Sequence, residues 1–463
     1  MDFASSSDPA VQHQLDRLAA LSLPQGRFGL ETIRALCDRL GNPQTRLPPV
    51  FHVAGTNGKG STCAYLRAIL EAQGLTVHAA TKPHLVRYNE RIRIAGKLVS
   101  DAELAALLGE VLDAGEDLAP SFFEVTTAAT FLVFARHRAD ACVIEVGLGG
   151  RFDATNVLDH QAACGIASLG IDHEAFLLAP EEGVPSDPLS RIAFEKAGIA
   201  RAGVPLVTQA YPKEVTRTII EHAMLVGAKT AIRGLDWFAK VGERIAYRDA
   251  RGALDLPLPA MPGAHQADNA ALAVALLRHQ SAVAVSLEAM AHGIRTARWP
   301  ARLQLLGPGP LTALAAGHKL WLDGGHNPDA GAAIARFFGA EIVGGASTGT
   351  ARADLFADPN PNPAHAEPVE TPAPAIHLII GMLANKNPDA IVAPLRSLLA
   401  SLTVVPIAGS EAHPAAAFGP AARAAPDVAT ALAAMLHDGG DILIAGSLYL
   451  AGEVLKLNRE LPD

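Results

Sequence analysis

The chain is short of charge and of cysteine, and each shortage excludes a class of protein. Charged residues make up 18% of the 463 residues, and the formal net charge is -9. Because proteins that bind nucleic acids need a basic surface, this balance argues against a nucleic-acid partner. The cysteines form neither a CxxC pair nor a disulfide framework, which is typical of a reducing compartment. They are Cys37, Cys63, Cys142 and Cys164.

Long apolar runs are also missing. No uninterrupted run reaches the roughly 18 residues that a transmembrane helix requires. The first residues, MDFASSSDPAVQHQLDRL, lack the cationic region and the apolar stretch of a signal peptide. We therefore expect a cytoplasmic protein with no membrane partner.

Apolar residues are nevertheless plentiful, at 49% of the chain, and they follow an α/β pattern. Short β-branched runs alternate with segments of helical periodicity, which is typical of a mostly parallel sheet with helices on both faces. The expected strands of the first set cover residues 50–54, 75–80, 141–146 and 163–168, with helices over 61–73 and 122–138. The expected strands of the second set cover residues 320–323, 376–381, 402–407 and 441–445.

Two punctuated stretches organise the chain. One core rarely exceeds about 250 to 300 residues, so two domains are expected. The Pro- and Gly-rich stretch 299–310 predicts a linker, which gives an N-terminal domain over 1–300 and a C-terminal domain over 301–463. Residues 344–374 are rich in Pro, Ala, Asp and Glu and predict a disordered surface insertion.

The sharpest local feature is FHVAGTNGKGST, residues 51–62. An expected strand runs into a Gly-rich turn with a lysine and then into a helix, which is the arrangement that holds the phosphates of ATP. The fit to the Walker consensus is imperfect, because Gly55 stands only three residues before Gly58 and Gly60 separates Lys59 from Ser61. The alternative is an ordinary strand-to-helix turn with a surface lysine.

GTNGKGS is also the form that this loop takes in the Mur ligase superfamily, and further segments resemble its folate branch, the dihydrofolate synthases/folylpolyglutamate synthases. They occur in the order of that family and span nearly the whole chain. They are PHLVRYNERI (83–92), SFFEVTTAATF (121–131), IEVGLGGRFDATN (144–156), IDHE (171–174), FEKAGI (194–199), GAHQADNA (263–270), DGGHNP (323–328) and GSLYLAGEV (446–454).

The resemblance implies a fold and a reaction. It implies an N-terminal P-loop ATPase-type domain and a smaller, Rossmann-like C-terminal domain, with ATP held between them in a monomer. The carboxylate of dihydropteroate or of a reduced folate attacks the γ-phosphate of ATP, and the amino group of L-glutamate then displaces phosphate from the acyl phosphate. ATP is the co-substrate, and two magnesium ions are expected. Whether the chain adds the first glutamate, extends the tail, or does both stays open.

A metal site is expected near the loop, because transfer of phosphate to a carboxylate brings two anions together. Glu145 ends a buried strand, where a carboxylate is costly unless it is paired or binds a cation; a strand-end salt bridge is the alternative. By resemblance, Glu145, His173 and Ser61 bind magnesium, and Lys196 does so as a carbamate. From the residues alone, His173 is equally a loop histidine and Lys196 an exposed helical lysine. Lys59, Lys196 and His173 are the expected catalytic residues.

The resemblance also implies substrate contacts. Paired phenylalanines are more often core residues, and a histidine after a strand is equally a helix-start residue. The expected ATP contacts are Thr56, Asn57, Gly58, Lys59, Gly60, Ser61, Asn269, Arg302, Asp323 and His326. The expected folate contacts are Ser121, Phe122, Phe123, Glu124, Phe152, Asp153 and Ala154.

One position departs from the family pattern. Where the folate branch has SPHL, this chain has KPHL, so Lys82 replaces a serine that helps to bind the first magnesium. A protonated lysine cannot bind magnesium, so either water completes the shell or the ammonium group contacts the γ-phosphate.

Two alternatives to the folate ligase remain. The first is a Mur-type ligase that acts on a UDP-linked sugar peptide. It would need an additional N-terminal domain, and only about 50 residues precede the loop. The second is a catalytically impaired nucleotide-binding relative, in which Lys82 disables the metal site.

Overall fold

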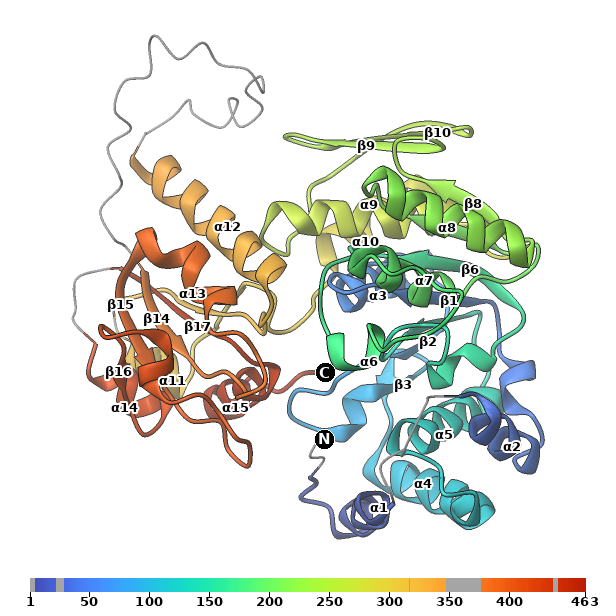
Figure 1. Ribbon diagram of the computed structural model, residues 1–463, viewed down its shortest axis with the longest axis horizontal. Coiled ribbons are helices and arrows are strands. Elements are labelled where there is room, and N and C mark those ends of the chain that lie inside the picture. Colours follow the sequence, from blue (N-terminus) through green and yellow to red (C-terminus); the bar gives the residue numbers. More distant parts are fainter. Residues whose placement is uncertain (1–4, 22–28, 316, 347–375, 436–439) are drawn as a thin grey trace. The chain divides into compact units, whose positions relative to one another are not determined.

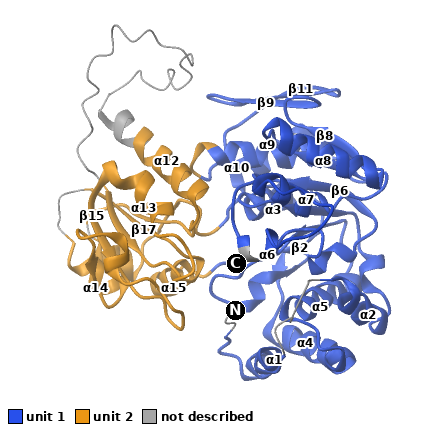
Figure 2. Cartoon of the chain, viewed as in Figure 1, with its two compact units in different colours: residues 1–261, 265–299, 462–463 blue, residues 262–264, 300–461 orange. Residues whose placement is uncertain are grey.

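The computed structural model describes residues 5–21, 29–315, 317–346, 376–435 and 440–463. The chain divides into two compact units (Figure 2). Unit 1 comprises residues 1–261, 265–299 and 462–463, and unit 2 comprises residues 262–264 and 300–461. The functional assignment of the expected domains stays a prediction. Of the expected insertion, residues 344–346 continue a helix, and residues 347–374 lie outside the described residues.

Unit 1 is built on an eight-stranded sheet, several strands of which are labelled in Figure 1. The strand order is β4-β3-β2-β5-β1-β6-β7-β8. The six strands from β2 to β8 along this order are parallel, and β3 and β4 add an antiparallel edge. The strands are β1 (Val50–Ala54), β2 (Val77–Ala80), β3 (Ile92–Ile94), β4 (Lys97–Leu98), β5 (Ala141–Glu145), β6 (Gln161–Ile166), β7 (Pro205–Thr208) and β8 (Lys229–Ile232).

Helices cover both faces of this sheet because its strands are apolar on both sides. Phe51 and Val53 of β1 pack with α3, α9 and α10, whereas Ala54 packs on the opposite face with α7 and α8. The helices are α1 (Pro9–Ala20), α2 (Glu31–Arg39), α3 (Lys59–Ala72), α4 (Asp101–Gly115), α5 (Phe122–Arg136), α6 (Glu174–Leu177), α7 (Pro188–Ala197), α8 (Lys213–Val226), α9 (Ala264–Arg278) and α10 (Leu287–Thr296).

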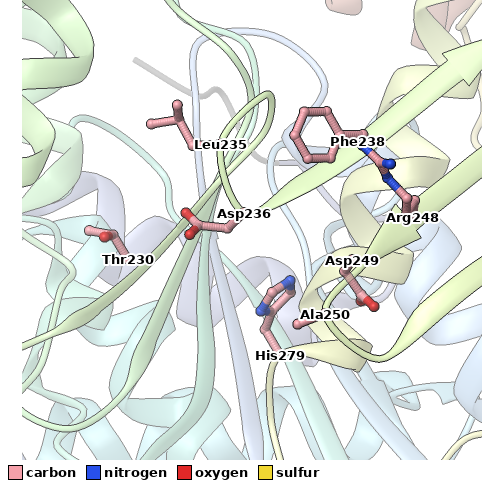
Figure 3. A pocket seen from close by; sticks show the side chains of 8 residues that line it. All are labelled: Thr230, Leu235, Asp236, Phe238, Arg248, Asp249, Ala250 and His279. Atoms are coloured by element: carbon pink, nitrogen blue, oxygen red, sulfur yellow. The ribbon is translucent and has the colours of Figure 1, made fainter.

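A three-stranded antiparallel sheet, which was not predicted, also belongs to unit 1. It consists of β9 (Trp237–Val241), β10 (Ile245–Asp249) and β11 (Gly252–Leu256) in the order β11-β10-β9. Trp237 and Tyr247 point into the core of the unit, and Phe238 and Arg248 point away from it. The outward side chains border the hollow shown in Figure 3, which contains none of the predicted site residues.

Unit 2 has a six-stranded sheet in the order β12-β13-β17-β14-β15-β16, parallel except for β12. Its strands are β12 (Gln304–Leu305), β13 (Leu320–Leu322), β14 (Ile376–Ile380), β15 (Leu399–Val404), β16 (Arg423–Ala424) and β17 (Asp441–Ala445). Its helices are α11 (Pro310–Leu314), α12 (Pro328–Ala346), α13 (Asp389–Leu395), α14 (Val428–Ala433) and α15 (Leu448–Asn458). No helix in the described part of the chain is long and apolar enough to cross a membrane.

The two parallel sheets confirm the predicted α/β class. The bounds of six of the eight predicted strands were wrong by one to three residues, and the largest errors at strand ends are those of β15 and β6. Strand β15 ends at Val404 rather than Ile407, and Val405 and Ile407 are buried outside the strand, so their apolarity was misleading. Strand β6 ends at Ile166 rather than Ser168, because Ser168 turns towards the loop that follows β1.

Candidate active site

The phosphate loop lies at the carboxyl end of β1, the middle strand of the parallel region. Gly55 and Gly58 have φ values of 152° and 81°, which favour glycine. The loop leads into α3 at Lys59, so the free backbone N–H groups of the helix start face the loop. The ammonium group of Lys59 donates to the carbonyl oxygens of Gly55 at 2.8 Å and Thr56 at 3.1 Å. The side chain of Lys59 therefore folds back over the loop that precedes α3.

The two residues between these glycines tie the loop to the chain that follows β6. The backbone N–H of Thr56 donates to the carbonyl of Ser168 at 2.7 Å, and its hydroxyl contacts both the carbonyl and the N–H of Gly170. Asn57 accepts a hydrogen bond from the hydroxyl of Ser168 at 3.2 Å. These bonds fix the loop against the segment that leads to His173.

Close packing explains the glycines that depart from the Walker consensus. A β-carbon on Gly58 would overlap the amide oxygen of Asn269 on α9. A β-carbon on Gly60 would lie 2.7 Å from the indole nitrogen of Trp299. Trp299 was missed as a site residue, because its role is to pack against the backbone of the loop. Ser61, the expected metal ligand of this loop, is buried in the first turn of α3.

Glu145 is the last residue of β5 and is 3% exposed. One carboxylate oxygen accepts the backbone N–H of Lys82 at 3.0 Å, so the end of β5 is joined to the turn after β2. Burial, and then the charge of Glu145, raise the pKa of the Cys63 thiol, whereas Lys59 lowers it. Glu145 and Lys59 therefore lie near the same turn of α3.

Lys196 lies in the last turn of α7 and is 4% exposed, so the expectation of an exposed lysine from pattern alone was wrong. Burial, and then the positive charge of Lys59, lower its pKa to about 7 from the usual 10.5. The carboxylates of Asp172, Asp153 and Glu195 oppose this shift. Near neutral pH a large share of this side chain is therefore an uncharged amine.

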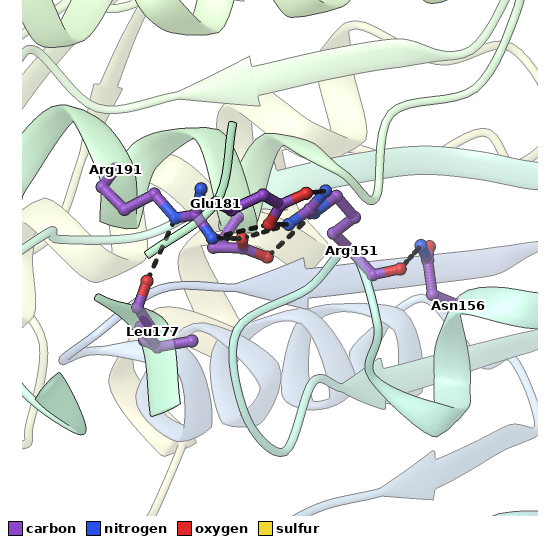
Figure 4. Close-up of polar contacts among 6 residues, drawn as sticks. Arg151, Asn156, Leu177, Glu181 and Arg191 are labelled. Atoms are coloured by element: carbon purple, nitrogen blue, oxygen red, sulfur yellow. Dashed lines mark hydrogen bonds and ion pairs between the residues drawn. The ribbon is translucent and has the colours of Figure 1, made fainter. Parts of the chain in front are cut away.

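A network of arginine and glutamate side chains anchors α7 (Figure 4). Arg151 contacts Glu181 at 2.5 Å and Glu195 at 2.7 Å, and Arg191 contacts the same two carboxylates at 2.8 and 3.0 Å. The backbone N–H of Arg151 also donates to the carbonyl of Glu195 at 2.7 Å. Because Glu195 precedes Lys196, the network fixes the turn of α7 that carries this lysine.

His173 lies in a left-handed turn at the start of α6, with φ 54°. Its side chain is 49% exposed, and its Nε2 atom lies 4.0 Å from Asp172. Asp172, which was not predicted, is the residue of this motif whose charge acts on Lys196. Asp172 could have been predicted as a site residue from its position in the IDHE motif, which follows a parallel strand.

The turn after β5 is organised by Asp153. Its carboxylate accepts the backbone N–H groups of Gly147, Leu148 and Thr155 and the hydroxyl of Thr155, at 2.5 to 3.0 Å. Asp153, which was predicted to contact folate, therefore also has a structural role, because its carboxylate fixes this turn. Of its neighbours, Phe152 stacks on the Arg151 guanidinium at 4.2 Å and Ala154 is buried.

The SFFE segment starts α5 with a capping box. Ser121 and Glu124 exchange hydrogen bonds between their side chains and backbone N–H groups at 2.7 and 3.3 Å. Phe122 packs edge-on against Tyr88 at 5.7 Å, on the core side. Phe123 is 44% exposed and is the aromatic ring of the pair that faces solvent.

In unit 2, the expected nucleotide contacts gather at the end of β13. Asp323 accepts the backbone N–H groups of Leu303 at 2.8 Å and Gly325 at 2.6 Å. The Arg302 guanidinium packs against Gly324, whose carbonyl contacts the ring of His326 at 3.1 Å. The structure thus brings Arg302, Asp323 and His326 into one loop cluster.

The donors near the loop include groups that magnesium accepts as ligands, the carboxylate of Glu145 and the hydroxyl of Ser61. Within the described ranges, no group of three or more His, Cys, Asp or Glu side chains could hold a metal ion. The predicted set does not need such a group, because Ser61 and a modified Lys196 would supply two of its four ligands. A buried carboxylate at Glu145 and a lysine with a lowered pKa fit a site that is completed by phosphate oxygens and water.

Comparisons with known proteins add independent findings. No protein-family model matches the chain. It is 35% identical over 324 residues to the dihydrofolate synthase/folylpolyglutamate synthase of Bacillus subtilis, which covers 65% of this chain and 70% of the relative. It is 32% identical over 451 residues to the folylpolyglutamate synthase of Lacticaseibacillus casei, which covers 91% of this chain and 92% of the relative.

Solved structures with a similar fold span the whole molecule. The Escherichia coli FolC structure in complex with DHPP and ADP aligns with a TM-score of 0.78 at 29% identity, covering 97% of each chain. A bifunctional folylpolyglutamate synthase/dihydrofolate synthase with Mn, AMPPNP and L-glutamate bound aligns with a TM-score of 0.78 at 28% identity, covering 97% of this chain and 99% of the other.

Proposed function

The chain belongs to the dihydrofolate synthase/folylpolyglutamate synthase family and is an ATP-dependent ligase of glutamate to folates, and we propose that it acts on dihydropteroate and on reduced folate glutamates. The proposal is supported by one observation at the carboxyl edge of the parallel sheet: the charges of Lys59 and Glu145 both act on the pKa of Cys63, and the charge of Lys59 also lowers the pKa of Lys196. This edge is where open α/β sheets bind ligands.

The chain's own groups fit the first step, which joins two anions. An oxygen of the acceptor carboxylate attacks the γ-phosphorus of ATP, the bond to the β,γ-bridging oxygen breaks, and ADP leaves. Lys59 and the N–H groups at the start of α3 stabilise the charge on the phosphates. The loop glycines let the backbone approach the phosphates closely.

The second step forms the amide bond. The neutral amino group of L-glutamate attacks the acyl carbon of the acyl phosphate, inorganic phosphate leaves with the electrons of the C–O bond, and the amine loses a proton. The ion pairs of Glu195 fix α7, and the hydrogen bonds to Asp153 fix the turn after β5. Both would keep the acyl phosphate and the amino group of glutamate in position for attack.

Magnesium would be held by Ser61, Glu145, His173 and the carbamate of Lys196, with the phosphates of the nucleotide. When bound, it neutralises charge on the phosphate oxygens during transfer. The low pKa of Lys196 supports the carbamate, because only the neutral amine reacts with carbon dioxide.

The remaining assignments belong to the same proposal. Phe123, Phe152 and Ala154 border the folate site, and Asp153 shapes it. The proposed nucleotide contacts are Asn269 in unit 1 and, in unit 2, Arg302, Asp323 and His326. We further propose a monomer in the cytoplasm, with the ATPase and folate-binding functions in residues 1–300 and the Rossmann-like ligase domain in residues 301–463.

A substrate-dependent ADP-release assay tests this function. The purified chain, with ATP and magnesium, is given L-glutamate with dihydropteroate or with tetrahydrofolate monoglutamate in parallel reactions. We expect ADP release that depends on both substrates, and products heavier by one glutamyl residue in mass spectrometry. If the protein binds ATP but shows no turnover with either acceptor, the ligase activity is refuted and a nucleotide-binding relative is favoured.

A further inference from the structure

Lys82 carries a buried ammonium group for which the described residues provide no hydrogen-bond acceptor. The residue follows β2, and its backbone N–H is held by Glu145. Its side chain runs along the turn after β5, where a β-carbon on Gly147 would lie 3.4 Å from the ammonium nitrogen. The ammonium group therefore lies beside the turn whose strand ends in the proposed metal ligand.

The nearby carboxylate of Asp153 does not satisfy this ammonium group. Burial raises the pKa of Asp153, but the charge of Lys82 and hydrogen bonds from Thr155 and Leu148 outweigh it, so the pKa lies below its usual value. The four bonds that the Asp153 oxygens accept already come from the turn and from Thr155. A carboxylate has about four lone-pair sites, so Lys82 is close enough to interact with this charge but gains no hydrogen bond from it.

A buried ammonium group without an acceptor is costly, since it loses the hydrogen bonds of its hydration shell and gains none in return. The adjacent turns, after β1 and β5, are the ones assigned above to phosphate and to folate. An anionic oxygen of a substrate would give Lys82 the acceptor that the described residues do not provide.

We propose that Lys82 is a catalytic residue that donates a hydrogen bond from its ammonium group to an anionic oxygen of the reacting pair. This oxygen belongs to the γ-phosphoryl group of ATP or to the acceptor carboxylate that attacks it. The inference rests on the proposed function. It makes Lys82 a working replacement for the serine of the family pattern rather than a disabling change.

Ligand binding distinguishes the two sources. Lys82→Met removes the charge but keeps the length, and Lys82→Gln serves if the first variant does not fold. The affinities for ADP, AMPPNP and dihydropteroate are measured by calorimetry with magnesium, the last in the presence of ADP. Lys97→Met, at an exposed lysine on β4, is the matched control.

We expect one ligand to lose affinity by about tenfold or more, the usual effect of losing a hydrogen bond to a charged group. A loss for AMPPNP with ADP unchanged assigns the contact to the γ-phosphoryl group. A loss for dihydropteroate with AMPPNP unchanged assigns it to the carboxylate. Lys82→Arg, which keeps the charge, should retain more affinity than Lys82→Met for the same ligand.

Two results would overturn the assignment. Affinities within twofold of the parent for all three ligands would show that Lys82 touches none of them. Equal losses for ADP and AMPPNP would place its effect away from the reacting oxygens. A parent chain that binds neither AMPPNP nor dihydropteroate would instead refute the proposed function.

Discussion

The amide oxygen of Asn269 occupies the space beside Gly58 where a β-carbon would stand. Gly58 also has a φ of 81°, so both space and backbone require glycine here. The helix α9 therefore closes the phosphate loop from outside, through a contact that no local motif reveals.

Gly58→Ala should impair nucleotide binding more than the backbone strain alone predicts. The left-handed φ costs about 1 to 2 kcal/mol for alanine, and the overlap with Asn269 distorts the loop as well. Gly74→Ala is the control, because its φ is 84° and nothing lies within 4 Å of an added β-carbon. Urea unfolding and ADP titration check the pair. If both variants bind ADP equally well, the contact with Asn269 does not shape the loop.

Lys59→Ala should lower kcat by about 100-fold or more, as removal of one charge-stabilising donor does in other enzymes. The expected basis is loss of the charge at the phosphates, with the fold retained. Circular dichroism and ADP release measure the two effects. Lys213→Ala, at the exposed start of α8, should change neither. Near-normal turnover in Lys59→Ala would contradict the role of the loop.

Lys196 should carry a carbamate whose formation increases with pH. With a pKa of about 7, its neutral amine is the minor form at pH 6 and the major form at pH 8. Carbon-13 NMR after incubation with labelled bicarbonate should show a carbamate signal that grows over this range. The signal should be lost in Lys196→Arg and kept in Lys213→Arg. A signal that survives Lys196→Arg would assign the modification elsewhere.

Arg151→Met should destabilise unit 1 by about 2 kcal/mol, because two largely buried carboxylates lose charge-assisted hydrogen bonds from this arginine. Glu181 and Glu195, with side chains 16% and 7% exposed, each lose one of their two arginines. Urea unfolding followed by fluorescence measures the change. Arg217→Met breaks ion pairs of α8 in which the arginine is 64% exposed, and it should cost less than about 1 kcal/mol. Equal effects would mean that the network does not anchor α7.

Lys82→Ser should strengthen binding of a divalent ion by about threefold or more, because it removes a positive charge beside Gly147, in the turn that follows Glu145. Manganese binding followed by electron paramagnetic resonance, and the magnesium dependence of the rate, both report this change. Lys97→Ser should leave both unchanged. An unaltered titration in Lys82→Ser would place the ammonium group far from the metal.

Much of the fold was predictable because apolar strands and amphipathic segments have distinct periods. The strand from Val50 to Ala54 and the strand from Asp441 to Ala445 were predicted to the residue. The sheet β9–β11 was missed, although Ile245–Asp249 alternates between buried and exposed side chains. Its three consecutive strands interrupt the alternation of strands and helices that characterises the rest of the chain. An interpretation based on that alternation therefore overlooked them.

Site residues that follow parallel strands were predictable from the sequence. Site features that depend on the packing of segments distant in sequence were not. Lys59 and Glu145 follow from their places at the ends of β1 and β5. The burial of Lys196 could not be read from FEKAGI, because it depends on the fold, which packs Gly150 of the turn after β5 against the last turn of α7. Likewise, nothing in the sequence indicates that Trp299 packs against Gly60.

In the proposed function, the eight-stranded sheet gives each reactant a support of its own. The nucleotide loop extends from β1, the lysine turn from β2 and the folate-side turn from β5, while the strands beneath them are mutually hydrogen-bonded and rigid. A substitution in one turn thus acts first on the reactant that this turn is proposed to hold, and reaches the next turn through contacts such as the bond between Lys82 and Glu145. An enzyme constructed in this way can change its choice of acceptor over evolution while it continues to consume ATP.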